Sequence, residues 1–293
     1  MNKEKLGSIG LFLTSIIWGY TFVAIKVLLY TLHPFFIVGF RNILAGSILF
    51  LIFIKYTKDI KIKDIIYSTP VALALFGGFS LQTLGSQTMT ASKVAFITGA
   101  YMIFIPFITW ILYKKAPHIL TFVSTFIALV GIYLLSSFKG FDSINIGDIY
   151  LILSSLSLAI HLVLIDRTLI KVNGIKLTVL QLLISGVVSL IFALTTSAYI
   201  NIDSISSKSI FSFLYLALFG SAIAYLLQTV SQKYVAPTKT SIILSLESLM
   251  GAIMGIIFLK EDININLVIG GSLIIIAIFV CELENIRKHN KKE

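Results

Sequence analysis

The chain has 293 residues, 57% of them hydrophobic and 12% charged, and its formal net charge is +10. A soluble domain keeps most of its charged residues at a wet surface, so this composition excludes a soluble protein and indicates an integral membrane protein. The apolar runs lack the period-two polar alternation of a membrane barrel, so we expect helices.

Ten apolar runs are each long enough to cross a hydrocarbon core of about 30 Å as a helix. We place them near residues 7–29, 35–54, 65–89, 92–113, 118–137, 147–166, 176–197, 209–231, 238–259 and 264–283. Little chain remains outside them, which predicts an all-α integral membrane protein with ten transmembrane helices and no soluble domain at either end.

Basic residues indicate how these helices are oriented. If the spans alternate and the N-terminus is cytoplasmic, seventeen Lys and Arg residues fall on the inner side and five in outer loops. Cytoplasmic loops carry the excess of Lys and Arg, so we expect cytoplasmic N and C termini in a multi-pass protein of the plasma (inner) membrane. The net charge is then a topology signal, and we expect no nucleic acid partner.

The segment LALFG occurs twice, at 73–77 and 216–220, and Gln-Thr follows each copy, at 82–83 and 228–229. A shift of 140 to 146 residues superposes the two halves of the chain. We therefore predict two five-helix repeats, 1–139 and 140–293. Because five is odd, the second repeat is inverted in the membrane, and transporters of this kind bind substrate between their halves near the midplane.

Polar and aromatic residues inside the spans are candidate functional positions. Trp18 lies too deep in the first span for an interfacial aromatic belt, so it either packs or lines a cavity. Gln82 in the third span, and Tyr225 and Gln228 in the eighth, lie on polar helix faces that must contact protein or water. Two interpretations stay open for these faces: hydrogen bonds between helices, or the lining of a substrate path.

The fourth and ninth spans begin with Ser92-Lys93 and Thr238-Lys239. We expect Ser92 and Thr238 to cap these helices, and the lysines to add to the positive field of each helix start, where anions are attracted. The alternative is that both lysines lie among lipid headgroups. The fourth span continues through Thr98 and Tyr101 to a proline at position 106, where we expect a kink.

Three ionisable residues lie inside spans. Glu247, which the repeat matches with Tyr101, lies near the midplane of the ninth span, where an acid is by default a functional candidate. It either exchanges a proton during transport or bonds neighbouring helices, with Arg41 as a possible ion-pair partner. We expect Arg41, in the second span, to have a structural role first. His161 in the sixth span is, taken alone, more often a packing residue than a proton carrier.

The chain resembles the EamA-type branch of the drug/metabolite transporter (DMT) superfamily in the order of its motifs. The start of its first repeat is similar to Trp18-Gly19, Phe22, Lys26, Pro34 and Arg41 here. Its fourth span is similar to the stretch from Thr90 through Phe96 to Pro106, and the acidic end of its second repeat to the ninth span ending in Lys260-Glu261. The resemblance implies two inverted five-helix repeats, a cavity lined by spans 1, 3, 4, 6, 8 and 9, and transport of small metabolites, often outward. Lys114-Lys115 departs from it, because an acid is frequent there.

The sequence has no metalloprotease, nucleophile-elbow or phosphate-loop motif, so we expect no enzyme activity and no cofactor. We predict a permease that moves a small metabolite, an amino acid or related amphipathic solute, by alternating access, and we expect export. The alternative is a membrane-embedded enzyme acting on a lipid or lipid-linked substrate. The expected partners are the solute, the bilayer and protons as a candidate coupling ion, in a monomer or homodimer. The predicted path residues are Trp18, Gln82, Lys93, Thr98, Tyr101, His161, Tyr225, Gln228, Lys239 and Glu247.

Overall fold

The structure is a computed structural model that describes residues 3–114, 116, 119–136, 145–196, 198–235 and 237–290. The helices are α1 (Lys3–Leu28), α2 (Pro34–Ile52), α3 (Ile54–Thr57), α4 (Ile62–Gly85), α5 (Ala91–Gly99), α6 (Tyr101–Tyr113), α7 (Ile119–Ser136), α8 (Ile146–Thr168), α9 (Gly174–Thr195), α10 (Ser207–Tyr215), α11 (Ala224–Gln232), α12 (Pro237–Leu259) and α13 (Ile265–Asn290). A 3-10 turn covers Ile202–Ser204, and a π-helix, Leu216–Ile223, joins α10 to α11.

The described helices make an all-helical bundle of the length and composition that a membrane requires. Seven helical segments are long and apolar enough to cross a bilayer, with α5 and α6 counted as one segment and α10 to α11 as another. Shorter apolar stretches lie in α7, α12 and α13. The chain is therefore a multi-pass membrane protein, whereas the count of ten spans and the cytoplasmic termini stay predictions.

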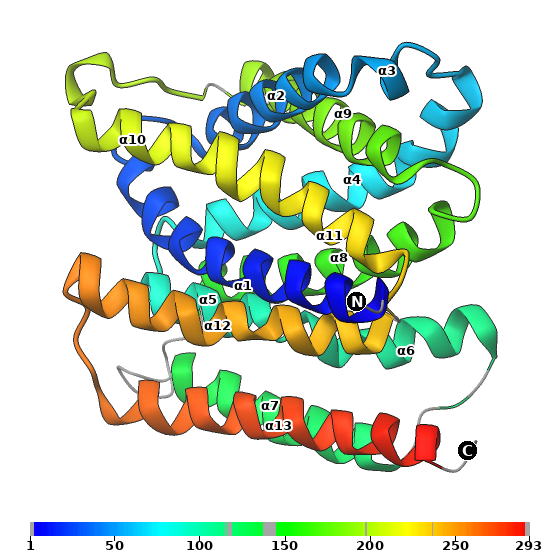
Figure 1. The fold of residues 1–293 in the computed structure, drawn as a ribbon. Coiled ribbons are helices and arrows are strands. Elements are labelled where there is room, and N and C mark those ends of the chain that lie inside the picture. Colours follow the sequence, from blue (N-terminus) through cyan, green and yellow to red (C-terminus); the bar gives the residue numbers. More distant parts are fainter. Residues whose placement is uncertain are drawn as a thin grey trace.

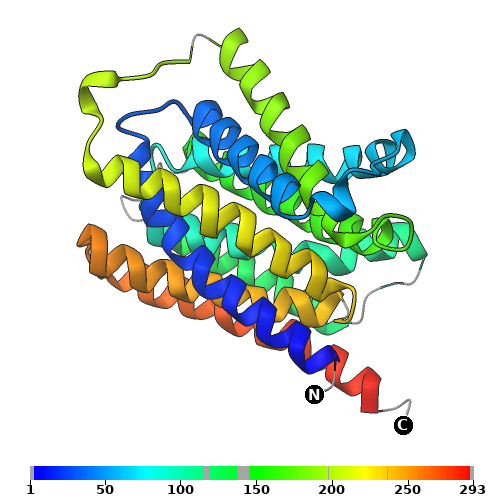
Figure 2. The ribbon, with the colours of Figure 1, turned by 45° about the horizontal axis from the view of Figure 1, so that its top comes forward.

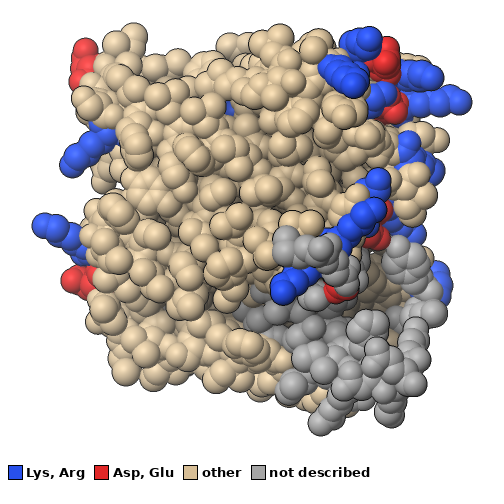
Figure 3. Space-filling view, viewed as in Figure 1, with Lys and Arg blue, Asp and Glu red and all other residues tan. Residues whose placement is uncertain are grey.

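Charge is distributed as a bilayer would require. Figure 3 shows Lys, Arg, Asp and Glu at the two ends of the helices, with a broad uncharged belt between them on the face in view. Large apolar side chains are exposed along the helices, for example Leu153 of α8, Leu194 of α9 and Ile257 of α12. Lipid is the solvent that accommodates such a surface, because its tails are as apolar as these side chains.

The helices pack in pairs that repeat between the two halves of the chain. Helix α4 packs against α8, and the α10–α11 segment packs against α1 in the same way, while α2 pairs with α9 and α7 with α13. Figures 1 and 2 show α2 and α9 at one edge of the bundle, α7 and α13 at the other, and α1 between the α10–α11 segment and α12. The start of α1 and the end of α13 lie at the same end of the bundle.

Small residues set the crossing of α2 with α9. A Cβ added at Gly46 would lie 2.8 Å from the side chain of Leu183, and one added at Gly186 would lie 2.9 Å from that of Ile43. The 140-residue shift that relates the halves of the sequence matches Gly46 with Gly186 and Ile43 with Leu183, so each contact is the repeat counterpart of the other. Glycines at both positions let the helix backbones approach closely, which is how membrane helices gain packing energy.

Several helices begin at a side chain that accepts from the first helical turn. Asn145 accepts from the N–H of Gly147 before α8, Asn173 from that of Ile175 before α9, and Ser206 from that of Ser209 before α10. These bonds satisfy N–H groups that have no partner within the helix.

One local prediction for the fourth span and one for the ninth were wrong. The N-cap of α5 is Thr90, not Ser92, since the Thr90 side chain accepts from the N–H of Lys93. The span also breaks at Ala100, between α5 and α6; Pro106 lies inside α6, and the kink expected there stays a prediction. Thr238 lies inside α12, which already begins at Pro237, so it is not the cap either.

Candidate functional site

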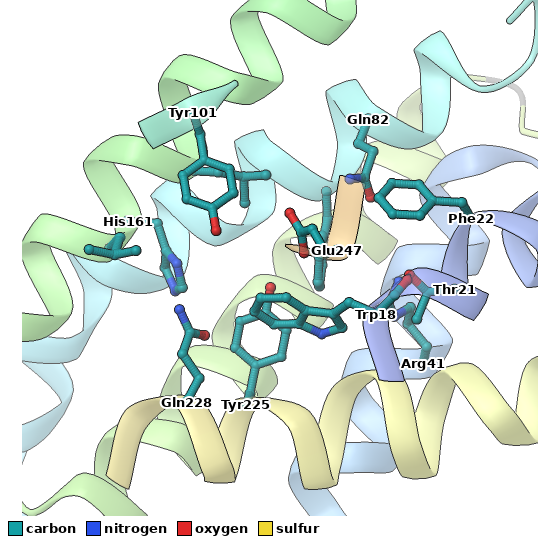
Figure 4. A pocket seen from close by; sticks show the side chains of 13 residues that line it. Trp18, Thr21, Phe22, Arg41, Gln82, Tyr101, His161, Tyr225, Gln228 and Glu247 are labelled. Atoms are coloured by element: carbon teal, nitrogen blue, oxygen red, sulfur yellow. The ribbon is translucent and has the colours of Figure 1, made fainter. Parts of the chain in front are cut away.

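A small cavity lies between the two halves of the bundle, and its lining comes from α1, α2, α4, α6, α8, α11 and α12 (Figure 4). Its volume is about 30 Å³, which is room for about two water molecules. This conformation therefore has no space for a metabolite. The lining residues are Trp18, Thr21, Phe22, Arg41, Phe79, Gln82, Tyr101, Leu158, His161, Leu162, Tyr225, Gln228 and Glu247.

Seven of the ten predicted path residues line this one cavity. They are Trp18, Gln82, Tyr101, His161, Tyr225, Gln228 and Glu247. They come from six different helical spans that lie far apart in the chain, and the close view shows them facing a common space. The structure thus brings together most of the residues that the sequence singled out.

The other three predicted residues are not part of the lining. Lys93 is 2.8 Å from Asp148 in an ion pair that joins α5 to α8. Thr98 is fully buried, donates to the carbonyl of Val94, and accepts at its own carbonyl from Ser155. The side chain of Lys239 lies outside the described residues.

Aromatic rings make one wall of the cavity. Tyr225 of α11 lies at its centre, with ring centroids 5.1 Å from Trp18, 5.4 Å from Phe79 and 5.8 Å from His161. Such tilted and edge-on pairs hold one another in place and present a rigid apolar surface. This wall can cover the apolar part of an amphipathic ligand.

Arg41 lines the cavity as well, and the sequence did not assign it to the path. The side chain is 1% exposed, its Nε donates to the Ser221 hydroxyl at 2.8 Å, and its Nη2 donates to the Gly220 carbonyl at 3.3 Å. The guanidinium carbon lies 4.2 Å from the ring centroid of Phe79. A buried Arg with two neutral acceptors and an aromatic ring retains a full positive charge beside the cavity.

The two LALFG copies differ in helix type, and the second copy contacts Arg41 and Trp18. The first copy lies in the continuous α4, whereas the second lies in the π-helix. The Gly220 carbonyl, inside the π-helix, accepts from Trp18 Nε1 at 3.0 Å as well as from Arg41. Single π-turns in long helices are frequent at functional sites, and here the irregular turn supplies a carbonyl to two cavity residues.

Glu247 is buried at 5% exposure and faces the same cavity from α12 (Figure 4). Within the described part of the chain, its carboxyl group has neither a hydrogen-bond donor nor a basic nitrogen within ion-pair distance, so the expected pairing with Arg41 is not made. Tyr101 Oη and Gln228 Oε1 are also buried, and neither has a hydrogen-bond partner among the described residues. Unsatisfied buried polar atoms are costly, so two of them beside an acid without a partner, all around one space, indicate a binding site.

His161 is held by a chain of polar groups. Its Nε2 lies 2.8 Å from Gln181 Oε1, and Gln181 Nε2 donates to Thr229 Oγ1 at 3.2 Å. Because an amide oxygen only accepts, Nε2 is the donor, and Nδ1 is left as the acceptor of the neutral ring. This chain joins α8, α9 and α11 and fixes the ring against Tyr225.

Glu261 closes the bundle at the end opposite the start of α1. Its carboxylate accepts from the N–H of Ala91 at 2.5 Å, from that of Ser92 at 3.0 Å and from the Ser92 hydroxyl at 2.6 Å. These bonds tie the end of α12 to the first turn of α5. Lys114 and Lys260, which the repeat matches, both have positive φ angles, 59° and 54°, but Lys115, the counterpart of Glu261, lies outside the described residues.

Comparisons with known proteins agree with this architecture. A model of the EamA-like transporter family matches residues 5–137 and again residues 145–282. An uncharacterized transporter of Archaeoglobus fulgidus is 29% identical over 96% of this chain and 87% of its own length. The uncharacterized transporter YoaV of Bacillus subtilis is 23% identical, over 96% of this chain and 97% of its own.

Two further similarities are to a plant protein and to a solved structure. A WAT1-related chloroplastic protein of Arabidopsis thaliana is 24% identical over 90% of this chain and 66% of its own length. A solved crystal structure superposes with a TM-score of 0.69 over 94% of this chain and 96% of its own, at 11% identity. That last similarity concerns the fold alone.

Proposed function

We propose that this chain, which belongs to the EamA-like transporter family, carries a small zwitterionic metabolite, an amino acid or a related amphipathic solute, outward across the plasma membrane by alternating access. The observation that supports this most is that the cavity holds one basic and one acidic side chain, which can carry opposite charges. Arg41 and Glu247 both line it, yet they form no ion pair within the described residues. A ligand with both charges would give each its counterpart.

The proposal assigns a role to each group of lining residues. Arg41 has donors beyond its bonds to Ser221 and Gly220, and these would bind the solute carboxylate. Glu247 would bind the amine, assisted by Gln228 Oε1 and the Tyr101 hydroxyl. Trp18 and the ring of Tyr225 would cover the apolar part of the solute.

The proposed architecture is ten spans in two inverted repeats, 1–139 and 140–293, with both termini cytoplasmic. The symmetry of the α2–α9 crossing and the two matches of the family model support it. The excess of Lys and Arg at the end where α1 begins supports the orientation.

Alternating access requires the cavity to enlarge and to open to each side in turn. The bonds from the first turn of α5 to Glu261, together with the Lys93–Asp148 ion pair, would close the outer side. The break at Ala100 and the π-helix before α11 are the points at which the cavity-lining helices would bend. Broken helices at a midplane site are a recurring feature of secondary transporters.

Glu247 also offers a route for proton coupling. A carboxyl that binds an amine in one step and a proton in the next would make the two compete, so that an inward proton drives outward solute movement. This would also account for an acid at midplane depth that has no protein partner among the described residues.

A ligand series tests the proposal on purified protein. An amino acid, its amide and its N-acetyl derivative share a side chain but differ in charge, and a ligand of the folded state raises thermal stability. We expect a shift with the zwitterion and little with the other two. Arg41→Gln should remove the preference for a ligand with a free carboxylate, and Glu247→Gln should remove the preference for a free amine. Glu4→Gln, which changes an exposed acid, is the control.

Counterflow in proteoliposomes then tests transport itself. Amino acids that shift the melting temperature should exchange, and Glu247→Gln should abolish the pH dependence of the flux. If no zwitterion among the common amino acids binds or exchanges, or if the two derivatives bind as well as the parent, the assignment of substrate class is wrong. If the purified protein modifies a lipid instead, the assignment as a transporter is wrong.

A further inference from the structure

A second, larger depression lies on the outside of the bundle, at the end where α1 begins, and the proposed transport cycle does not use it. Its volume is about 510 Å³. Its lining comes from the first turns of α1, the start of α9, Phe53 and most of α11, and we refer to it as the α11 groove.

The α11 groove opens toward lipid. Among its lining residues, Leu6 is 50% exposed, Val230 40% and Tyr234 41%. Most of the lining is aliphatic or aromatic carbon, with Leu226 and Leu227 alongside the three exposed residues. Water in such a space would lack hydrogen-bond partners, whereas an acyl chain from the surrounding bilayer finds an apolar surface on either side.

The mouth of the groove is basic. Lys3 is one of the lining residues, and its Nζ lies 5.8 Å from the ring centroid of Tyr234. Lys233 Nζ lies 5.9 Å from the centroid of the same ring. Two ammonium groups and an amphipathic ring at the level where the helices end are the groups that meet a phospholipid headgroup.

We infer that the α11 groove is a binding site for an anionic glycerophospholipid of the leaflet at this end of the bundle. One acyl chain lies in the groove along Leu226, Leu227 and Val230, and the headgroup phosphate lies between Lys3 and Lys233. The charge of the mouth selects anionic over zwitterionic lipid, and the apolar lining selects a lipid over a soluble phosphate.

The site would act on the helix that carries part of the cavity lining. Tyr225 and Gln228 project from α11 into the cavity, as Figure 4 shows, while Val230 and Leu226 of the same helix line the groove. A lipid in the groove therefore packs against α11 from the side opposite the cavity. It stabilises one position of this helix, which follows the irregular π-turn.

Native mass spectrometry of the protein in detergent, titrated with phosphatidylglycerol or phosphatidylcholine, tests the inference. Val230→Trp fills the groove from an exposed position, and Lys3→Gln removes one charge from its mouth. The matched controls are Val187→Trp, on α9 at 48% exposure and outside the groove, and Lys5→Gln, two residues from Lys3.

We expect the unmodified protein to retain phosphatidylglycerol more tightly than phosphatidylcholine. Val230→Trp should retain one lipid fewer, and Lys3→Gln should weaken phosphatidylglycerol binding about fivefold while leaving phosphatidylcholine unchanged. Both controls should behave as the unmodified protein. The inference fails if Val230→Trp retains as many lipids as Val187→Trp, or if Lys3→Gln and Lys5→Gln affect phosphatidylglycerol equally. It also fails if inorganic phosphate alone displaces the bound lipid.

Discussion

Replacing Glu247 by methionine distinguishes a functional acid from a structural one by the sign of its effect on stability. Glu247 is 5% exposed, and no described residue bonds its carboxyl group. A buried polar group without a partner costs about 1 to 3 kcal/mol. Methionine has a similar length and no polar atom to satisfy. We therefore expect Glu247→Met to raise the free energy of unfolding by about 1 to 3 kcal/mol and to abolish transport.

Glu261→Met is the matched control, because this acid is fully engaged. Its carboxylate accepts from two backbone N–H groups and one hydroxyl of α5. Removal leaves these donors without an acceptor and weakens the start of α5, so we expect a loss of about 1 to 3 kcal/mol. The two substitutions are chemically identical and are expected to have opposite signs.

Unfolding by sodium dodecyl sulfate in mixed micelles, followed by near-UV circular dichroism, measures both free energies on the same scale. Counterflow in proteoliposomes measures transport by the same preparations. A loss of stability in Glu247→Met as large as that in Glu261→Met would mean that Glu247 holds helices together. Unchanged transport in Glu247→Met would remove it from the substrate path.

Three further predictions follow from single contacts. Trp18→Phe removes the donor to the Gly220 carbonyl but keeps a ring against Tyr225, so detergent unfolding should show a loss of about 1 kcal/mol. Gly186→Val places a Cβ 3.0 Å from the backbone nitrogen of Ile43 and should lower the free energy of unfolding by about 1 to 3 kcal/mol. Gly174→Ala is the control and should be tolerated, because the nearest neighbour of its Cβ would be 3.4 Å away. An equal loss of stability in both variants would refute the packing argument. His33 caps α2, since its Nδ1 accepts from the N–H of Phe35, and burial lowers its pKa. The stability that this cap contributes is therefore fully present above the ordinary His pKa and is lost as pH falls through the lowered pKa. We therefore expect the protection of the Phe35 amide, measured by hydrogen exchange relative to the rate in the unfolded chain, to rise with pH in the unmodified protein. In His33→Asn this protection should not depend on pH.

The positions of the spans could be predicted closely from the sequence. The expected run 35–54 corresponds to α2, Pro34–Ile52, and 147–166 to α8, Ile146–Thr168. Span length is a local property of composition, since a helix in lipid must satisfy its own backbone over the whole hydrocarbon core. The resemblance to the EamA-type family is confirmed by the family model that matches both halves. It could be predicted because the order of motifs along the chain carries it.

The breaks within the spans could not be predicted in this way. The proline at position 106 predicts a kink in this span, but no signal in the sequence marked Ala100, where the helix breaks. The two LALFG copies are identical in sequence, yet one is in a regular α-helix and the other in a π-helix. Their local propensities are the same, so the difference comes from the neighbours: Trp18 and Arg41 both donate to the Gly220 carbonyl in the second copy.

By itself, the sequence determined the class of the protein, its helical spans, its repeat and a set of polar positions inside the membrane, because all of these depend on composition and spacing along one chain. Only the tertiary structure decided which polar positions meet. It gathered Gln82, Tyr101, Gln228 and Glu247 around one cavity, added Arg41, and gave Lys93 to an ion pair elsewhere. The physical reason is that rotation of a helix about its axis is set by close packing against its neighbours, and that packing involves residues of both halves at once.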